Sequence, residues 1–251
     1  MAELSKIEIF RSLSLPALVQ EEVLRMIKAG ELVAGQHVNE VDLAERLKIS
    51  RPPVREALRS LEEAGLVRLE RNRGMFVRLV SETDAIELYQ VRAALDTEAG
   101  LLLAPKIADE QVHELERTLD EIEACGNNGV NRTFPLNIAF HDRIMEMAGN
   151  ALLLTVYRQV INRMHLLRRR SFSGGNAASH REHRAIVSAL ASRDGAAAAR
   201  AMRQHVENGF ERMRQASLND SDALTDSRTR WSRVPPTASR EAPGEVGIEV
   251  R

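Results

Sequence analysis

Apolar residues recur at helical spacing in three short segments near the start of the chain. The first segment ends at Gly30, and its inward positions are Val19, Val23, Met26 and Ile27. The second begins after Asn39, whose short polar side chain suits a helix N-cap, and its inward positions are Leu43, Ala44 and Leu47. The pattern therefore predicts two short amphipathic helices, with a third to follow.

The third segment has a marked beginning and end. Ser50 is a strong N-cap residue, and Pro52 and Pro53 stand in the first turn, where a missing N–H group costs little. Gly65 ends this helix, and its expected buried stripe is Val54, Ala57, Leu58 and Leu61. Two strands, about 66–70 and 75–80, follow and are joined through Asn72, Arg73 and Gly74. Three helices and a β-hairpin make a winged helix-turn-helix module.

From residue 82 to about residue 216 the pattern is helical throughout. Breaks at Pro or Gly predict six helices, at 82–104, 108–124, 131–148, 151–171, 177–193 and 195–216. Residues 217–251 are rich in Ser, Thr, Asp and Pro with little periodicity, so we expect a disordered tail there. The predicted fold is mainly α, with a winged helix-turn-helix module in residues 1–80 and an all-α antiparallel helical bundle in residues 81–216.

The composition is typical of a globular protein with a real core. The chain has 251 residues, of which 43% are hydrophobic and 28% charged. No apolar run is long enough to cross a bilayer, the first residues lack a signal-peptide core, and the single Cys125 cannot form an internal disulfide. We therefore expect a cytoplasmic location and no membrane partner.

Charge is distributed unevenly along the chain. Between Arg46 and Arg78 nine basic residues stand against four acidic ones. Between Glu82 and Gly126 twelve acidic residues stand against three basic ones. The change predicts a basic module that faces a polyanion, followed by a domain with another task.

Arg51, Arg55 and Arg59 share one face of the third helix, because residues four apart are helical neighbours. In a helix-turn-helix module this helix meets base edges in the major groove, where arginine matches guanine O6 and N7. Arg73 at the hairpin tip would reach phosphate or the minor groove, and Gly74 would allow a close backbone approach. A solvated arginine face is the plainer interpretation, but the cap, the prolines and the basic hairpin favour double-stranded DNA as the partner.

Histidines recur in the second half at positions that could meet inside a bundle. Asn137 and His141 lie at i and i+4 on one predicted helix, His180 and His183 on a later one, and His205 on the last. Neutral imidazoles bind zinc, nickel and other divalent ions, and facing helices can build such a site. Spacing alone does not separate a metal site from chance, since seven histidines in a chain of this length are unremarkable.

The stretch SRPPVREALRSLEEAGLVRLERNRGMFV resembles the signature of the GntR family of bacterial transcription regulators, and VNEVDLAERLKIS resembles that family's second helix. The resemblance covers about residues 15–80. It implies that Arg51, Arg55, Arg73 and Gly74 contact DNA. Many relatives carry Thr where this chain has Pro52, so one hydroxyl contact to phosphate is not expected here.

Four later stretches, YQVRAALDTEAG, NIAFHDRIMEMAGN, EHRAIVSALASRD and AMRQHVENG, resemble the FCD ligand-binding domain of the family's FadR-type branch. Six helices rather than seven place the chain nearer the VanR-like group. Members commonly hold a divalent metal ion with one aspartate and three histidines. The ligands implied here are Asn137, His141, His183 and His205, with His180 a weaker candidate. Because Asn137 replaces the usual Asp, we expect partial occupancy by zinc or nickel and a preference for an anionic ligand.

Two arginines are candidates for binding an effector carboxylate, because the planar guanidinium group matches it with two hydrogen bonds. Arg92 stands where relatives often carry an effector-binding arginine, and Arg212 lies two turns beyond His205 on the same helix face. The alternatives are an ion pair between Arg92 and Asp96, and a solvated surface charge at Arg212.

The resemblances imply a homodimeric regulator, usually a repressor, that binds a near-palindromic operator and is released by a small organic acid bound in the helical domain. A metal-dependent hydrolase is one alternative, but Glu182 lies about 100° around its helix from His183 and is a poor candidate base. In a second alternative, a metal-sensing regulator, the ion itself is the signal. We expect no enzymatic activity.

Overall fold

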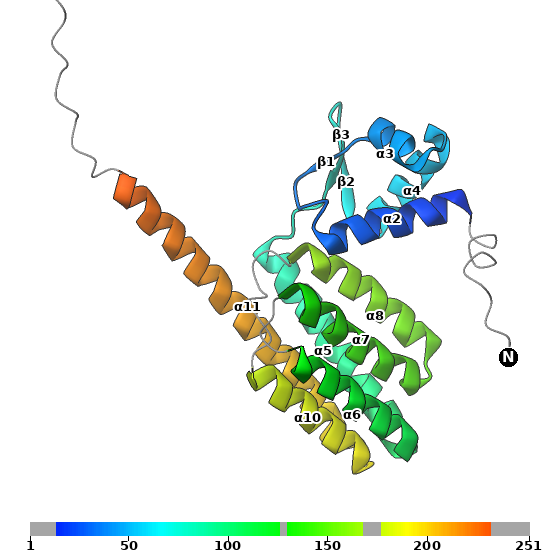
Figure 1. Cartoon of the computed structure of the whole chain (residues 1–251), viewed down its shortest axis with the longest axis vertical. Coiled ribbons are helices and arrows are strands. Elements are labelled where there is room, and N and C mark those ends of the chain that lie inside the picture. The colour runs from blue at the N-terminus through cyan, green and yellow to red at the C-terminus, as the bar shows by residue number, and fades with distance from the viewer. Residues whose placement is uncertain (1–13, 126–129, 168–176, 232–251) are drawn as a thin grey trace, which may run out of the picture.

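The computed structural model describes residues 14–125, 130–167 and 177–231 (Figure 1). Its first part contains α2 (Leu15–Ala29), β1 (His37–Val38), α3 (Glu40–Leu47), α4 (Arg51–Glu63), β2 (Val67–Glu70) and β3 (Gly74–Val77). Its second part contains α5 (Glu82–Leu103), α6 (Asp109–Ala124), α7 (Val130–Ala148), α8 (Ala151–Met164), α10 (Ala177–Ala191) and α11 (Gly195–Trp231), with short 3-10 turns at Ala104–Lys106 and His165–Leu167. The mainly helical fold predicted from the sequence is confirmed.

The first part packs three helices against a small antiparallel sheet in the order β1-β3-β2. Val67 pairs with Val77 and Glu70 with Gly74, which places the hairpin tip where the sequence predicted it. The predicted stripe of α4 is buried in the core of this module. Strand β1 was not expected, because two residues are too few to show an alternating pattern. It is held by pairing with β3, opposite Phe76, onto which the His37 ring packs.

Ser50 occupies the predicted N-cap position of α4 but, within the described part of the chain, its side chain makes no capping hydrogen bond. The reason is that Pro52 and Pro53, which follow in the first turn, have no N–H group to donate. An N-cap side chain accepts from the N–H group of the second or third helical residue, and these are Pro52 and Pro53. The expectation of a side-chain cap at Ser50 was therefore wrong.

The second part is a bundle in which α5 lies against α7, α8 and α11 (Figure 1). The six predicted helices are all present among the described residues, with ends within two residues of the prediction except for the fourth and the last. Helix α8 ends at Met164 and is followed by a 3-10 turn, and residues 168–171 of the predicted helix lie outside the described ranges. No helix of the described residues is long and apolar enough to span a membrane.

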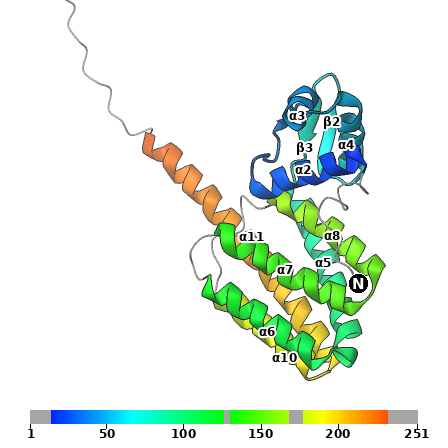
Figure 2. The same cartoon turned by 45° about the vertical axis from the view of Figure 1, so that its right-hand side comes forward.

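The last helix is longer than expected. Helix α11 continues to Trp231, through fifteen residues of the stretch predicted to be disordered, and residues 232–251 lie outside the described ranges. The chain has no Gly or Pro between Gly209 and Pro235, so nothing in the backbone stops the helix. Figures 1 and 2 show its C-terminal part extending beyond the bundle.

The two parts are in contact through α8, which lies next to α2 in both views (Figures 1 and 2). The Arg163 Nε group of α8 donates to the Ala64 carbonyl oxygen at the end of α4, over 2.7 Å. This bond joins the bundle directly to the helix that carries the predicted DNA-binding arginines.

Helices α5 and α11 approach closely at Gly100. A Cβ atom there would lie 3.0 Å from backbone atoms of both Ala198 and Ala199. Glycine inside a helix normally costs about 1 kcal/mol relative to alanine, so its presence here is explained by packing. The spacing of these two helices therefore depends on one missing side chain.

We predict that Gly100→Ala lowers the free energy of unfolding by about 1–3 kcal/mol, because overpacking outweighs the gain in helix propensity. Gly209→Ala is the matched control, because a Cβ atom on Gly209 would meet no described atom closer than 3.8 Å. The control should be neutral or slightly stabilising. Urea unfolding followed by circular dichroism measures both, and equal stability of the two variants would contradict the packing argument.

Candidate functional site

Helix α4 presents the predicted DNA-binding arginines to solvent. Arg51, Arg55 and Arg59 are exposed on the face opposite the buried stripe. Glu40, at the start of α3, lies 3.9 Å from Arg51 and 3.3 Å from Arg55. Exposed ion pairs of this kind contribute little and are easily exchanged, so a phosphate or a base edge can replace Glu40. The face is accessible to a polyanion.

The hairpin tip carries the other two predicted DNA-binding residues. Arg73 is exposed, pairs with Glu70, and holds its guanidinium group 5.0 Å from the centre of the Phe76 ring. Gly74 has a φ of 93°, and a Cβ atom there would lie 2.8 Å from His37 Nε2. Gly74 thus has a structural reason to be glycine, and its contact with DNA remains a prediction.

In the bundle, three helices bring three histidines together. His141 on α7, His183 on α10 and His205 on α11 are buried, and their Nε2 atoms lie 3.1 to 3.3 Å from one another. Two nitrogens that each lie about 2.1 Å from one zinc ion are separated by about 3.0 Å at a right angle and about 3.4 Å at the tetrahedral angle. The three nitrogens are therefore spaced as ligands of one ion. His180 does not belong to the converging set found among the described residues.

The three imidazoles are held in the form that binds a metal. Burial lowers the pKa of His141, His183 and His205, and the positive charge of Arg92 lowers each further. Glu182 opposes this shift at His205 but does not reverse it. The rings are consequently neutral near pH 7, as a ligand to a divalent ion must be.

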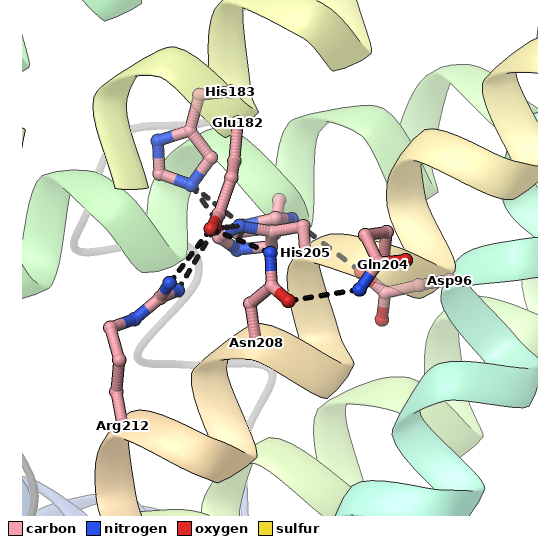
Figure 3. Close-up of polar contacts among 8 residues, drawn as sticks. Asp96, Glu182, His183, Gln204, His205, Asn208 and Arg212 are labelled. Carbon is pink, nitrogen blue, oxygen red and sulfur yellow. Dashed lines mark hydrogen bonds and ion pairs between the residues drawn. The ribbon is translucent and has the colours of Figure 1, made fainter. Parts of the chain in front are cut away.

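Glu182 orients His205 by binding Nδ1, the ring nitrogen that does not face the other two histidines (Figure 3). Its carboxylate accepts from His205 Nδ1 over 2.8 Å, from Asn208 over 2.8 Å, and from both terminal nitrogens of Arg212 over 2.7 and 2.9 Å. Burial opposes the ionisation of Glu182, but these hydrogen bonds outweigh it and lower its pKa to about 2. An ionised Glu182 fixes the proton of His205 on Nδ1 and leaves the Nε2 lone pair pointing at the other two histidines.

This arrangement bears on the roles considered for Arg212 and Glu182. Arg212 is not the solvated surface charge considered above, because both terminal nitrogens of its guanidinium group bind Glu182, and its contact with an effector remains a prediction. Glu182 contacts the outer nitrogen of His205 and not the space between the histidines. Its role could not be inferred from its place beside His183, because the contact is made to a different helix.

Beside the histidines lies a group of buried polar atoms that have no hydrogen-bond partner among the described residues. They are Arg92 Nε, both carboxylate oxygens of Asp96, Asn137 Oδ1, His141 Nδ1, Tyr157 Oη and His183 Nδ1. Such atoms are costly in a protein interior unless a ligand or ion meets them. The group is a candidate site for a polar ligand, and the buried amide oxygen of Asn137, one turn before His141 on α7, remains the predicted fourth metal ligand.

Arg92 stands between the two interpretations given to it from the sequence. Its Nε lies 3.6 Å from Asp96 Oδ2, so the expected ion pair is present but loose. Burial raises the pKa of Asp96 to about 6, against the attraction of Arg92. The sequence indicates Asp96 only as a possible partner of Arg92, and no sequence pattern marks Tyr157. The only sequence signal for Asp96 was its position one turn beyond Arg92.

Both parts of the chain are similar to known bacterial regulatory proteins. Residues 17–77 match the family described as "Bacterial regulatory proteins, gntR family", and residues 87–208 match the "FCD domain". The chain is 30% identical to the "Nta operon transcriptional regulator" of Aminobacter aminovorans, over 80% of this chain and 94% of that protein. It is 29% identical to the "HTH-type transcriptional repressor RspR" of Escherichia coli, over 78% and 87%. The solved structure of E. coli McbR/YncC shares the fold, with a TM-score of 0.71 at 20% identity over 81% and 98% of the two chains.

Replacing a converging histidine should remove bound metal. We predict that purified His141→Ala and His205→Ala each retain less than about a tenth of the zinc or nickel that the unchanged protein binds, since a site of three nitrogens loses one ligand. His113→Ala is the control, because His113 is exposed on α6 and pairs only with Glu116 in the described structure. Mass spectrometry measures the metal content of the unchanged protein and of the three variants. Equal content in all four proteins would exclude His141 and His205 as ligands.

Proposed function

The chain belongs to the gntR family of bacterial regulatory proteins and carries an FCD domain, and from this premise we propose that it is a repressor released from its operator by a small organic acid. Residues 1–80 would bind DNA and residues 81–216 the effector. A homodimer would place two copies of α4 on a near-palindromic operator, as two-fold symmetric helix-turn-helix proteins do. Because its target is DNA, the protein would act in the cytoplasm.

The exposed face of α4 supports the DNA-binding part of the proposal. Arg51 and Arg55 lie in the first two turns of the helix, where base contacts are made, and Arg59 lies one turn further along. Arg73 on the hairpin adds a cation that could contact phosphate. The arginines would exchange Glu40 and Glu70 for the nucleic acid, which releases counterions and makes binding sensitive to salt.

The convergence of three histidine Nε2 atoms beside a buried arginine is the observation that carries the effector part. His141, His183 and His205, with Asn137 as the fourth ligand, would hold a divalent ion, and zinc or nickel suits such a set. A bound ion would supply a Lewis-acidic position for a carboxylate oxygen. Arg92 carries a positive charge close to the imidazoles and would bind a second oxygen of the acid.

Tyr157 gives the acid a further partner. Its hydroxyl group is buried, it has no hydrogen-bond partner in the described part of the chain, and it lies near Arg92 and Asp96. Burial raises the pKa of Tyr157, so the phenol keeps its proton and can donate to a ligand oxygen. A ligand held by Arg92 and Tyr157 would join α5 to α8.

Regulation requires that the acid favour one arrangement of the dimer over another. Helix α8 supports such a link, because it carries Tyr157 near Arg92 and Asp96, and Arg163 against the end of α4. A cavity of about 310 Å³ lies beside this contact, lined by residues that include Gly65, Arg78, Asp84 and Arg163. Space at this contact would let α8 shift without a clash.

The family consists of transcriptional regulators and not of enzymes, so the hydrolase alternative is set aside. The site agrees, because the Glu182 carboxylate is occupied by His205, Asn208 and Arg212 and is not placed as a base for a metal-bound water. The metal-sensing alternative predicts that operator affinity changes when the ion is added without an organic acid. The proposal predicts that the acid is required.

Arg55→Ala should lose specific operator binding while the protein stays folded. A two-bond contact between arginine and guanine contributes about 1–3 kcal/mol of discrimination, so the preference for operator over random DNA should fall about 10- to 100-fold. Arg25→Ala is the control, because Arg25 is exposed on α2 and pairs with Glu22 and Glu31. Fluorescence anisotropy with operator DNA selected from the genome measures both. A retained preference would contradict the assigned role, as would a flat salt response between about 50 and 200 mM.

Arg92→Ala should keep operator affinity but lose release by the acid. A panel of small mono- and dicarboxylic acids, added to the metal-loaded protein on labelled operator, identifies the acid that releases the unchanged protein. The variant should then need at least about 10-fold more of it, because a buried charge-assisted pair is lost. Arg158→Ala is the control, since Arg158 is an exposed residue of α8 paired with Asp142 and Glu146. Release by metal alone would favour the metal-sensing alternative.

A further inference from the structure

Asp96 is a buried carboxylate whose environment does not account for it. It lies on α5 with no exposed surface, and neither of its oxygens has a hydrogen-bond partner among the residues the structure describes. Oδ2 faces Arg92 Nε at 3.6 Å, and Oδ1 faces His141 Nδ1 at 3.5 Å. A loose pair with Arg92 does not offset the cost of burying a carboxylate at this depth. The ion pair with Arg92 alone therefore does not explain why residue 96 is an acid.

The contact between Glu182 and His205 suggests a role for Asp96 beside His141. Glu182 binds the outer nitrogen of His205 and thereby leaves Nε2 of that ring as a lone-pair donor. Asp96 faces the corresponding outer nitrogen of His141, and His141 Nδ1 has no other partner in the described structure. The two acids come from different helices and approach two different rings from outside the cluster. The two carboxylates therefore occupy equivalent positions. Glu182 is hydrogen-bonded to His205 Nδ1 at 2.8 Å, whereas Asp96 lies 3.5 Å from His141 Nδ1.

Charge gives an independent argument. A divalent ion held by His141, His183, His205 and Asn137 would gain no compensating charge from these ligands, because imidazole binds a metal ion in its neutral form and an amide carries no charge. A carboxylate ligand at position 137 would offset part of that charge, but this chain has an amide there. Among the described residues, Asp96 is the fully buried acid that faces His141. It lies on α5, whereas residue 137 lies on α7.

We propose that Asp96 is a positioning residue of the metal centre, which accepts the Nδ1 proton of His141, holds its Nε2 as the metal ligand, and supplies the negative charge that Asn137 lacks. The inference rests on the proposed metal site. It goes further by assigning a role to a residue that is not itself a ligand, and by linking that role to residue 137.

Asp96→Asn tests the role directly, because it removes the charge and keeps the shape. With Zn²⁺ alone as the probe, in competition with a chromophoric chelator, the variant should bind about 10- to 100-fold more weakly than the unchanged protein. Asp142→Asn is the matched control, since Asp142 follows His141 on α7 but pairs with Arg158 at the surface. The control should bind zinc as before. Equal affinity of Asp96→Asn and the unchanged protein would refute the inference while leaving the metal site in place, whereas absence of zinc binding by the unchanged protein would refute both.

A double-mutant cycle separates the proposed role from a general loss of structure. If Asp96 supplies the charge that Asn137 lacks, Asn137→Asp should raise zinc affinity at least about 10-fold more in the Asp96→Asn background than in the unchanged protein. A structural role for Asp96 predicts the same gain in both backgrounds, and that result would contradict the proposal.

A measurement on the unchanged protein avoids any dependence on variant folding. Nuclear magnetic resonance spectra that correlate imidazole protons with both ring nitrogens of the zinc-loaded protein identify which nitrogen of each ring carries hydrogen. The proposal requires a slowly exchanging, hydrogen-bonded proton on Nδ1 of His141 and zinc on Nε2. Zinc on Nδ1, or an Nδ1 proton that exchanges rapidly with water, would overturn it.

Discussion

The burial of three imidazoles at one point of a largely apolar bundle is the constraint on which the second half of the molecule depends. Each ring must come from its own helix in the correct register, because a shift of one residue would turn it about 100° away from the cluster. Phe140 fixes two of the rings by packing against His141 and His183. Glu182 fixes the third by accepting the proton of His205. The polar cluster therefore sets the positions of α7, α10 and α11 relative to one another.

The helix that completes this arrangement is α5. Its Gly100 lets α11 approach closely, and one to two turns earlier it carries Asp96 and Arg92 toward the same centre. A wider spacing between α5 and α11 would move His205 away from the groups on α5. Packing and chemistry are thus coupled along one pair of helices, so that the absence of a side chain at residue 100 serves the site although Gly100 does not contact it.

Much of the fold could be predicted, because helical periodicity, glycine and proline mark the elements within a few residues. The periodicity of α4 identified its buried stripe and hence its arginine face. The capping role of Ser50 was mistaken, since the prolines that mark the helix start also lack the donors that a cap needs. The length of α11 was missed because a polar composition was taken for disorder, although no residue there breaks a helix.

The site was less accessible to sequence reasoning. Spacing could place Asn137 and His141 on one face, but the convergence of His183 and His205 on His141 depends on how three helices pack, and only the family resemblance suggested it. The carboxylates behind the rings left no pattern at all. Glu182 and Asp96 act across helix pairs, and contacts between residues far apart in sequence leave no periodic signal in either helix.

The contact between α8 and α4 offers the proposed effector site a route to the DNA-binding helix. Arg163 donates to a carbonyl group at the C-terminal end of α4, where the helix dipole favours a cation, while Arg51 and Arg55 lie at the other end. A helix of 13 residues is about 20 Å long, so a tilt of about 10° applied at one end displaces the other by about 3 Å. A displacement of that size exceeds the tolerance of a hydrogen bond to a base edge. In the proposed function, ligand contacts that tilt the DNA-binding module through α8 by this small amount would therefore change operator affinity.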